Sequence, residues 1–254
     1  MRFTGKTAIV TGAAGGIGSA VATQFAREGA NLCLADTRPE IAVAQEIRAL
    51  GRAVIEQLTD VTDSAAVRLM VARTLEAFGR VDILVNVAGV SSHGSSEQVT
   101  DAEWDRVLTN NLKSVFLCCR AVIPPMRAQR YGRIVNIGSI LGKNGGNPRP
   151  WIDRAEQTRA GNVAYGASKA GVHMLTMFLA KELAANGITV NAVAPGPIAS
   201  AMTVNFPETL RALIPVGRMG QAAEVAEAVC FLASDAAAFI TAEILDVNGG
   251  MWGD

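Results

Sequence analysis

The chain has 254 residues, half of them hydrophobic, and equal numbers of basic and acidic side chains, 23 of each. A chain of this length can bury a sizeable core as one α/β domain without disulfide or metal support. The zero net charge and the lack of a run of like charges argue against nucleic acid or a membrane surface as a partner. No apolar run reaches the roughly 18 residues of a membrane span.

Short β-branched or aliphatic runs alternate along the chain with longer helix-like segments. Seven strands are predicted, at residues 7–11, 31–35, 53–58, 83–86, 133–138, 189–192 and 244–247. Helices are predicted between them at residues 18–28, 39–50, 64–78, 102–127, 163–185 and 222–233. Thr100 or Asp101 can cap the helix that begins at Ala102, and Pro39 suits a first helical turn. The alternation predicts a single α/β domain over residues 1–254, a doubly wound parallel sheet with helices on both faces.

The four cysteines lie in apolar stretches and show no C-x-x-C spacing, which is typical of reduced thiols in a core. The chain passes from Met1 almost directly into the first predicted strand, without room for a signal peptide. We therefore expect a cytoplasmic protein. The two histidines, His93 and His173, have no metal-ligand spacing with cysteine or carboxylates, and we expect no metal.

A glycine-rich segment follows the first predicted strand directly. It reads Thr11-Gly-Ala-Ala-Gly-Gly-Ile-Gly18, and a helix-like segment begins at its end. A strand-to-helix turn without side chains lets the backbone approach a pyrophosphate, and the helix N-terminus directs unpaired N–H groups at it. The segment predicts a dinucleotide site that includes Gly12, Gly16, Ile17 and Gly18; a tight packing turn is the alternative.

Asp36 ends the second predicted strand, where an acidic side chain can accept hydrogen bonds from the hydroxyls of an adenosine ribose. Its charge would repel a 2′-phosphate, and neither Ala13 nor Ala14 offers a cation to bind one. The sequence therefore predicts NAD rather than NADP, although the nearby Arg38 could weaken that preference.

Tyr165 and Lys169 stand four residues apart in a predicted helix, so their side chains lie on one face. A free phenol has a pKa of about 10 and is seldom ionised at neutral pH, but a nearby ammonium favours the phenolate. Tyr165 could then take the proton of an alcohol, or return it to a ketone, while hydride moves to or from a nicotinamide. Ser139 follows a predicted strand at the carboxyl edge of the sheet, where its hydroxyl could bind the substrate oxygen.

The order of these motifs resembles the short-chain dehydrogenase/reductase family over nearly the whole chain. The first turn is similar to that family's T-G-x-x-x-G-I-G, and Asp60 and Val61 resemble a pair that contacts adenine. The run Asn86-Val-Ala88-Gly89 resembles the motif N-N-A-G, which steadies the central sheet, with Val87 in place of the second Asn. The segment 195–200 resembles the nicotinamide-holding P-G-x-I-x-T, which implies cofactor contacts for Pro195, Gly196, Ile198 and Ser200.

The resemblance also implies roles for two further side chains and for assembly. Asn111 would kink its helix and hold a water that relays protons to Lys169, and the ammonium of Lys169 would also bind the nicotinamide ribose. Family members commonly form tetramers through the two long central helices, so we expect a homotetramer. The spacing between Ser139 and Tyr165 is about twice that of the family.

The extra length lies in residues 141–162, which are rich in Gly, Pro, Asn and Arg. We expect a lid in which Trp151 closes the substrate pocket and an arginine meets an anionic group; a solvated excursion or a subunit contact is the alternative. His93 could border the substrate, although a lone His is more often only a surface residue.

The sequence thus favours an NAD-linked oxidoreductase that acts on a secondary alcohol or the matching ketone. Two alternatives stay open. A 3-ketoacyl reductase would normally use NADPH and a basic surface for its carrier protein, and Asp36 and the zero net charge argue against both. A catalytically silent NAD-binding scaffold or sensor could share the fold, but the joint presence of Ser139, Tyr165 and Lys169 disfavours it.

Overall fold

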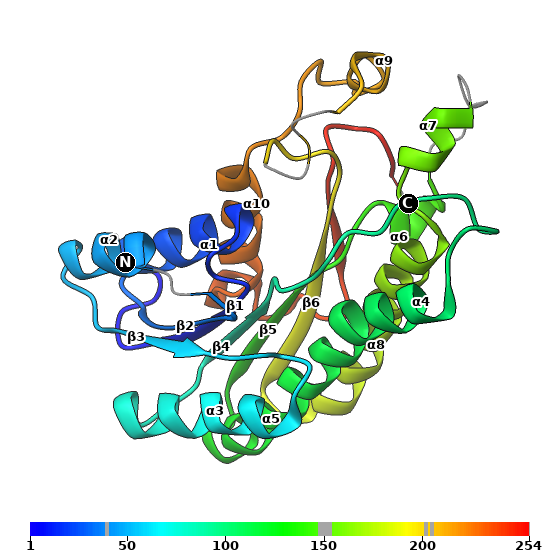
Figure 1. Cartoon of the computed structure of the whole chain (residues 1–254). Coiled ribbons are helices and arrows are strands. Elements are labelled where there is room, and N and C mark those ends of the chain that lie inside the picture. The colour runs from blue at the N-terminus through cyan, green and yellow to red at the C-terminus, as the bar shows by residue number, and fades with distance from the viewer. Residues whose placement is uncertain (39–40, 147–153, 201–202, 204–205, 254) are drawn as a thin grey trace.

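A computed structural model describes residues 1–38, 41–146, 154–200, 203 and 206–253 (Figure 1). Seven strands form one parallel sheet in the order β3-β2-β1-β4-β5-β6-β7. They are β1 (Thr7–Thr11), β2 (Asn31–Asp36), β3 (Val54–Leu58), β4 (Ile83–Asn86), β5 (Gly132–Ile137), β6 (Ile188–Pro195) and β7 (Ile244–Val247). The predicted fold class and strand number are confirmed. The strand order changes direction between β1 and β4, the position where ligands bind in doubly wound sheets.

The central strands β1, β4, β5 and β6 are buried along their whole length, which explains why their sequences are mainly apolar rather than alternating. The outer strand β3 is only partly buried. β6 is longer than predicted at both ends, because its backbone pairs with β5 from Ile188 and with β7 as far as Pro195.

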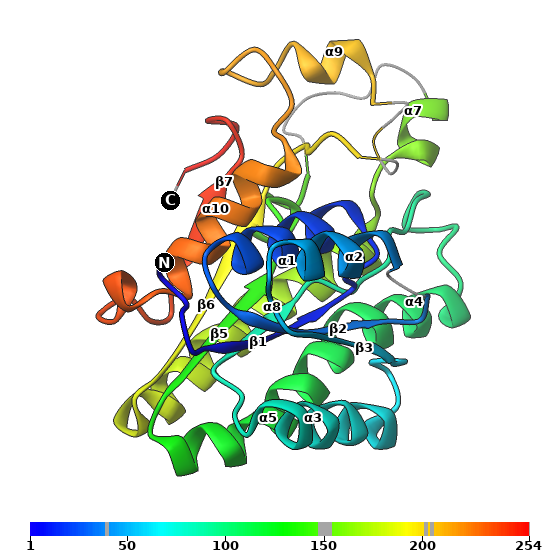
Figure 2. The same ribbon diagram turned by 90° about the vertical axis from the view of Figure 1, so that its left-hand side faces the viewer.

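Helices cover both faces of the sheet (Figures 1 and 2). One face carries α1 (Gly16–Arg27), α2 (Ile41–Ala49) and α10 (Ala222–Leu232), and the other carries α3 (Ser64–Phe78), α5 (Ser114–Gln129) and α8 (Val163–Leu183). Each layer has its own core: Phe25 and Val229 belong to the first, and Met70 and Val172 to the second. Short helices α6 (Leu141–Asn144), α7 (Arg154–Arg159) and α9 (Glu208–Arg211) lie beyond the carboxyl edge of the sheet.

The single helix predicted over residues 102–127 is wrong in one respect, because a π-helical turn interrupts it. α4 (Asp101–Leu108) is followed by a π-helical turn at Thr109–Lys113 and only then by α5. Thr100 caps α4 as predicted, since its hydroxyl accepts the Glu103 N–H at 3.2 Å. Pro39, predicted in a first helical turn, lies outside the described residues.

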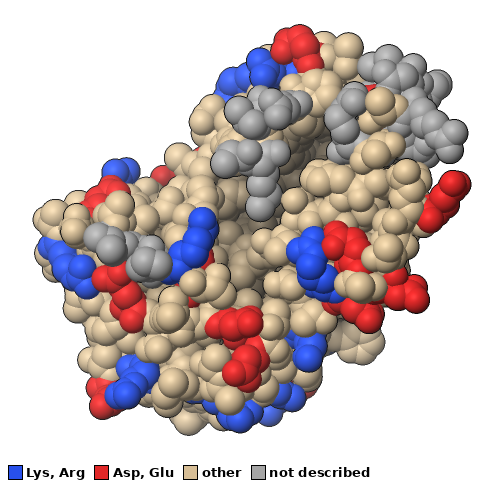
Figure 3. Space-filling model, viewed as in Figure 1, with Lys and Arg blue, Asp and Glu red and all other residues tan. Residues whose placement is uncertain are grey.

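The carboxyl ends of the strands open into a hollow that lies between the α1–α2 side of the molecule and the α4–α8 side (Figure 3). The walls of this hollow are formed mostly by uncharged residues in this view. Within the described residues, no helix is both long and apolar enough to cross a membrane.

Candidate active site

The glycine-rich turn joins β1 to α1 and has little room for side chains on its inner side. Gly12 has a φ of +65°, and a Cβ there would lie 2.8 Å from the backbone of Ala88; a Cβ on Gly18 would lie 2.1 Å from the Gly12 oxygen. A Cβ on Gly16, in contrast, would meet no protein atom within 4 Å. The open space therefore lies above Gly16, where α1 begins.

The N-terminus of α1 is free to bind an anion. Its N-cap is Gly15, which provides no side-chain hydrogen bond, and the first N–H groups of a helix have no partner within it. These groups and the helix dipole favour a negative group in the space above Gly16. The residues present therefore fit the pyrophosphate of a dinucleotide.

Asp36 ends β2 beside this turn, with its carboxylate buried and held by backbone groups. One carboxylate oxygen accepts the Ala14 N–H at 3.1 Å, and the other accepts the Arg38 N–H at 3.1 Å. The guanidinium of Arg38 lies 3.5 Å from the carboxylate but is itself two-thirds exposed. The negative charge is thus held next to the glycine-rich turn, while the nearby cation is largely exposed to solvent.

The predicted motifs at the ends of β3 and β4, Asp60-Val61 and the run that begins at Asn86, lie at the carboxyl edge of the sheet, as Asp36 does. Val61 is buried in the core below α3, whereas Asp60 is exposed and its carboxylate accepts the N–H and hydroxyl of Thr62. The Asn86 amide donates to Asn136 on β5 at 2.9 Å, which ties β4 to β5 inside the sheet. The side-chain oxygen Oδ1 of Asn86 is buried, without a hydrogen-bond partner among the described residues.

Ser139, Tyr165 and Lys169 come together at the ends of β5 and α8. Ser139 follows β5 and is buried, and its hydroxyl accepts the Leu141 N–H at 3.1 Å and also hydrogen-bonds the Tyr165 hydroxyl. Lys169, one helical turn after Tyr165, lies with Nζ 5.8 Å from the centre of the tyrosine ring. Its ammonium donates to the Ile137 carbonyl at 2.7 Å. The predicted constellation is therefore assembled in space.

Burial shifts the pKa values of both titratable groups in opposite directions. Desolvation raises the pKa of Tyr165 above its usual range, and the hydrogen bond from Ser139 opposes this. Desolvation lowers the pKa of Lys169 to about 8. At neutral pH Tyr165 is therefore a phenol and Lys169 is mostly an ammonium. The site thus holds a proton donor, the phenol, beside a cation, the ammonium.

Asn111 lies in the π-helical turn and is fully buried. Its side chain accepts the Val90 N–H at 2.7 Å and donates to the Val90 carbonyl at 3.0 Å and to Ser168 on α8 at 3.1 Å. A Cβ on Gly89 would lie 3.1 Å from Asn111 Oδ1 and 3.8 Å from Lys169 Nζ. Asn111 and Lys169 thus both lie close to the backbone of Gly89.

Three of the remaining predicted residues, Gly196, Ile198 and Ser200, follow β6. Gly196 packs on the backbone of Asn248 so closely that a Cβ would lie 2.9 Å from it, and Ile198 is buried beside it. Ser200 is exposed, and its N–H donates to the Thr203 hydroxyl at 2.9 Å. His93 is exposed. Trp151 lies outside the described residues.

Sequence reasoning missed two side chains that hold this site. Asn162 caps α8: its side chain accepts the Tyr165 N–H and donates to Ser92 and to the His93 carbonyl, both at 2.8 Å. An Asn three residues before Tyr165, at the start of a predicted helix, is the signal that would have found it. His173 accepts the Ser139 N–H at 3.3 Å. His173 stands four residues after Lys169 in a predicted helix, so the sequence could have placed it on the same face as Lys169.

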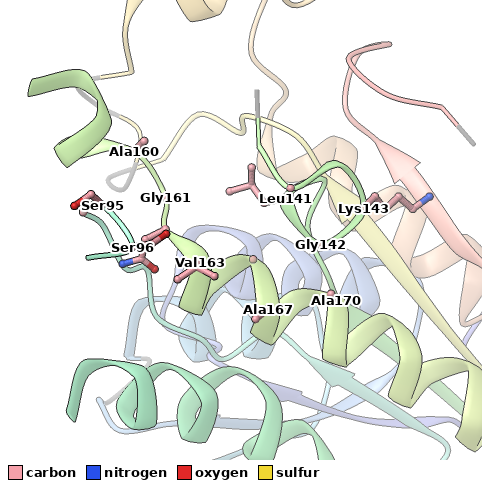
Figure 4. A pocket seen from close by; sticks show the side chains of 14 residues that line it. Ser95, Ser96, Leu141, Gly142, Lys143, Ala160, Gly161, Val163, Ala167 and Ala170 are labelled. Carbon is pink, nitrogen blue, oxygen red and sulfur yellow. The ribbon is translucent and has the colours of Figure 1, made fainter. Parts of the chain in front are cut away.

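A pocket of about 600 Å³ lies beside α8, lined by residues 94–96, parts of residues 141–145 and 160–163, and Gly166, Ala167 and Ala170 (Figure 4). Tyr165, Lys169 and Ser139 do not line it, and its wall is a different face of α8 from theirs. Lys143, which also lines it, is paired with Asp246 on β7 at 2.9 Å. This pocket is therefore adjacent to the candidate site and separate from it.

No cluster of His, Cys, Asp and Glu side chains among the described residues could hold a metal ion. The four cysteines are free and buried, as the sequence predicts. Burial raises the pKa of Cys119 to about 12, so this thiol is protonated at neutral pH and a poor nucleophile.

Comparisons with known proteins agree with this geometry. The family model described as enoyl-(acyl carrier protein) reductase matches residues 12–252. The 3-oxoacyl-(acyl-carrier-protein) reductases of Thermotoga maritima and Escherichia coli strain K12 are 39% and 40% identical, and the alignments cover 99% of each chain. The crystal structure of levodione reductase has a TM-score of 0.89 at 34% identity, over 98% of both chains. The chain therefore belongs to the short-chain dehydrogenase/reductase family, oxidoreductases that use a nicotinamide cofactor.

Proposed function

We propose that the protein transfers hydride between NAD(H) and a secondary alcohol or the matching ketone, with Tyr165 as the acid and base. The observation that carries this proposal is the convergence of Ser139, Tyr165 and Lys169 at the edge of the sheet onto which the glycine-rich turn opens. The nicotinamide ring supplies the hydride acceptor or donor, and the chain's residues supply position and proton transfer.

In the direction of ketone reduction, the hydroxyls of Ser139 and Tyr165 bind the carbonyl oxygen of the substrate. Tyr165 then gives its proton to that oxygen as negative charge develops on it. The pKa of Tyr165 is raised by burial, so the proton is present at neutral pH. The neighbouring Lys169 ammonium stabilises the phenolate that remains.

In the reverse direction, Tyr165 takes the alcohol proton. We propose that this proton then leaves the site past Lys169 and Asn111. We propose that Asn111 holds a water there, because its side chain already bridges Val90 and α8 beside Lys169 Nζ. Gly12, Gly16, Ile17 and Gly18 would hold the pyrophosphate, and Asp60, Val61, Asn86, Ala88 and Gly89 would border the adenosine and the nicotinamide ribose. Pro195, Gly196, Ile198 and Ser200 would hold the nicotinamide.

Asp36 is proposed to select NAD over NADP. Replacing it with Asn removes the charge that repels a 2′-phosphate, and like-charge contacts cost several kcal/mol. We expect the ratio of kcat/KM for NADH to that for NADPH to fall by about 10-fold to about 100-fold, at 1.4 kcal/mol per tenfold. Arg38→Ala should move the ratio in the opposite direction, because it removes a cation that lies 3.5 Å from the Asp36 carboxylate. An Asp36→Asn variant with an unchanged ratio would disprove the role.

A 3-oxoacyl thioester is the second candidate substrate, because the 3-oxoacyl-(acyl-carrier-protein) reductases are similar over the full length. A cyclic ketone is the alternative, supported by the similarity to levodione reductase. Steady-state reduction of acetoacetyl-coenzyme A and of a cyclic diketone, each with NADH and with NADPH, separates these. Turnover of either ketone with NADH supports an NAD-linked oxidoreductase. Turnover of the thioester with NADPH alone would favour a 3-ketoacyl reductase. No turnover of any ketone or alcohol would favour a catalytically silent NAD-binding scaffold.

The segment 141–162 is proposed to shape the substrate pocket. Its first turn, α6, begins two residues after Ser139, and its last residue, Asn162, caps the helix that carries Tyr165. The described ends of the segment therefore lie next to the two residues whose hydroxyls would bind the substrate oxygen.

We also propose that the protein is a homotetramer with one interface on α5 and α8. Phe178, Met174 and Val163 on α8 are exposed by 69%, 54% and 46%, and Phe116 on α5 is exposed by 42%. A row of large apolar side chains on two neighbouring helices is typical of a protein interface. A second copy would also close the pocket beside Gly166 and Ala170.

Phe178→Asp should break this assembly, because it places a charge inside the apolar interface. Light scattering coupled to size exclusion should show a fall in mass to that of a smaller assembly. Leu69→Asp on α3, which is also half exposed, is the matched control and should keep the wild-type mass. A monomeric wild-type protein would refute the interface.

A further inference from the structure

The turn that carries Ser139 is held by a complete set of backbone hydrogen bonds. The N–H groups of residues 138–142 donate, in order, to the Val193 carbonyl, His173 Nε2, the Pro195 carbonyl, the Ser139 hydroxyl and the Ser139 carbonyl. Four of these acceptors belong to β6 or to the turn itself. The fifth, His173, belongs to α8, so it links Ser139 to the helix that carries Tyr165.

The imidazole of His173 fits into the curve of this turn. A Cβ on Gly138 would lie 2.2 Å from His173 Nε2, and a Cβ on Gly142 would lie 2.9 Å from its Cε1. Gly138, just before Ser139, and Gly142, three residues after it, are therefore glycines where a side chain would displace the ring. His173 is also buried, at 6% exposure, so water does not compete for the Ser139 N–H.

Tyr165, Lys169 and His173 follow one another at intervals of four residues and lie on the same side of α8. Two of them contact the end of β5 and its following turn: Lys169 Nζ donates to the Ile137 carbonyl at 2.7 Å, and His173 accepts from Ser139. Under the proposed function Lys169 must also serve the cofactor and Tyr165. His173 has neither task and can hold Ser139 throughout the reaction.

We infer that His173 is a positioning residue that keeps the Ser139 hydroxyl within hydrogen-bonding reach of Tyr165 and of the substrate oxygen. This role rests on the proposed function. A backbone N–H can only donate, so Nε2 of His173 must be an unprotonated acceptor and the ring must carry its proton on Nδ1. The inference therefore fixes a tautomer as well as a role.

The tautomer can be measured without turnover. The chain has two histidines, so ¹⁵N-histidine NMR of the whole protein gives two ring patterns, and the spectrum of His93→Gln assigns the one that remains to His173. We expect His173 to be neutral at neutral pH, with Nδ1 protonated and Nε2 bare. A proton on Nε2 would overturn the inference.

The role is tested by kinetics in two backgrounds. His173→Leu keeps an apolar side chain of similar size but removes the acceptor, and we expect kcat to fall by about 10-fold to about 100-fold, as small misplacements of catalytic groups do. The KM for NADH should change little. His173→Gln, whose amide oxygen can take the place of Nε2, should restore most of kcat.

In a Ser139→Ala background, His173→Leu should have no further effect on kcat, because the hydroxyl that it positions is already absent. An equal loss in both backgrounds would show that His173 only supports the fold and would overturn the inference; thermal unfolding midpoints of all variants identify any that fold poorly. If the wild-type protein reduces no ketone, the proposed function fails and the positioning role fails with it, while the NMR spectrum still shows whether the hydrogen bond exists.

Discussion

Tyr165→Phe should abolish turnover and leave cofactor binding intact. The substitution removes only the hydroxyl, so α8 and the surroundings of Lys169 keep their packing, but no group remains to move the substrate proton. General acid–base catalysis contributes about 100-fold to about 10,000-fold, and the loss in kcat/KM should fall in that range or above it. The measurement pairs steady-state NADH consumption with titration calorimetry of NAD⁺ binding.

The chain provides its own control, because it has only two tyrosines. The hydroxyl of the other, Tyr131, lies 3.0 Å from Asp235, near the start of β5 and away from the candidate site. Tyr131→Phe should keep wild-type kcat. A Tyr165→Phe variant that still turned over substrate would remove Tyr165 from the mechanism.

The second large effect concerns the stability of the fold and its dependence on pH. Burial lowers the pKa of Lys169 from its usual 10.5 to about 8. Between these pH values the unfolded chain holds the lysine proton and the folded chain does not, so the free energy of unfolding rises with pH in this window. At 1.36 kcal/mol per pKa unit, the rise amounts to about 3 kcal/mol.

Lys169→Met isolates this effect. The free energy of unfolding of the wild type minus that of the variant should increase by about 3 kcal/mol from pH 8 to pH 10.5 and stay flat below pH 8, where both states of the wild type are protonated. Urea titrations of both proteins across this range give the difference. The variant should also lose turnover and bind NAD⁺ more weakly. A difference that did not change with pH would mean that Lys169 is not desolvated.

The sequence predicted the sheet, and it named most residues of the proposed site, because both depend on short-range patterns. The four central strands are buried and show as mainly apolar runs, and residues with a clear chemical signature stand at strand ends, such as Asp36 at the end of β2 and Ser139 just after β5. In parallel sheets the carboxyl ends of the strands meet, so these residues had to converge.

The features that were missed, among them the π-helical turn and the role of His173, depend on tertiary contacts. The π-helical turn at Asn111 depends on the Val90 backbone, which the asparagine side chain contacts across 21 positions of sequence. In the sequence His173 looks like any other helical residue, because its contact with the turn after β5 exists only in the folded chain. Nothing in the sequence links it to Gly138 and Gly142, the two glycines that make room for its ring. Substrate choice depends in the same way on loops at the mouth of the hollow, and their side chains carry no periodic signal.

One measurement tests the central claim most directly. NADH that carries deuterium at its transferable position is incubated with the protein and the ketone that it reduces best, and the product is examined by mass spectrometry and NMR. We predict one deuterium on the carbinol carbon, as direct hydride transfer from the nicotinamide requires. Product without deuterium on that carbon, or no product from any ketone despite tight NADH binding, would contradict the account.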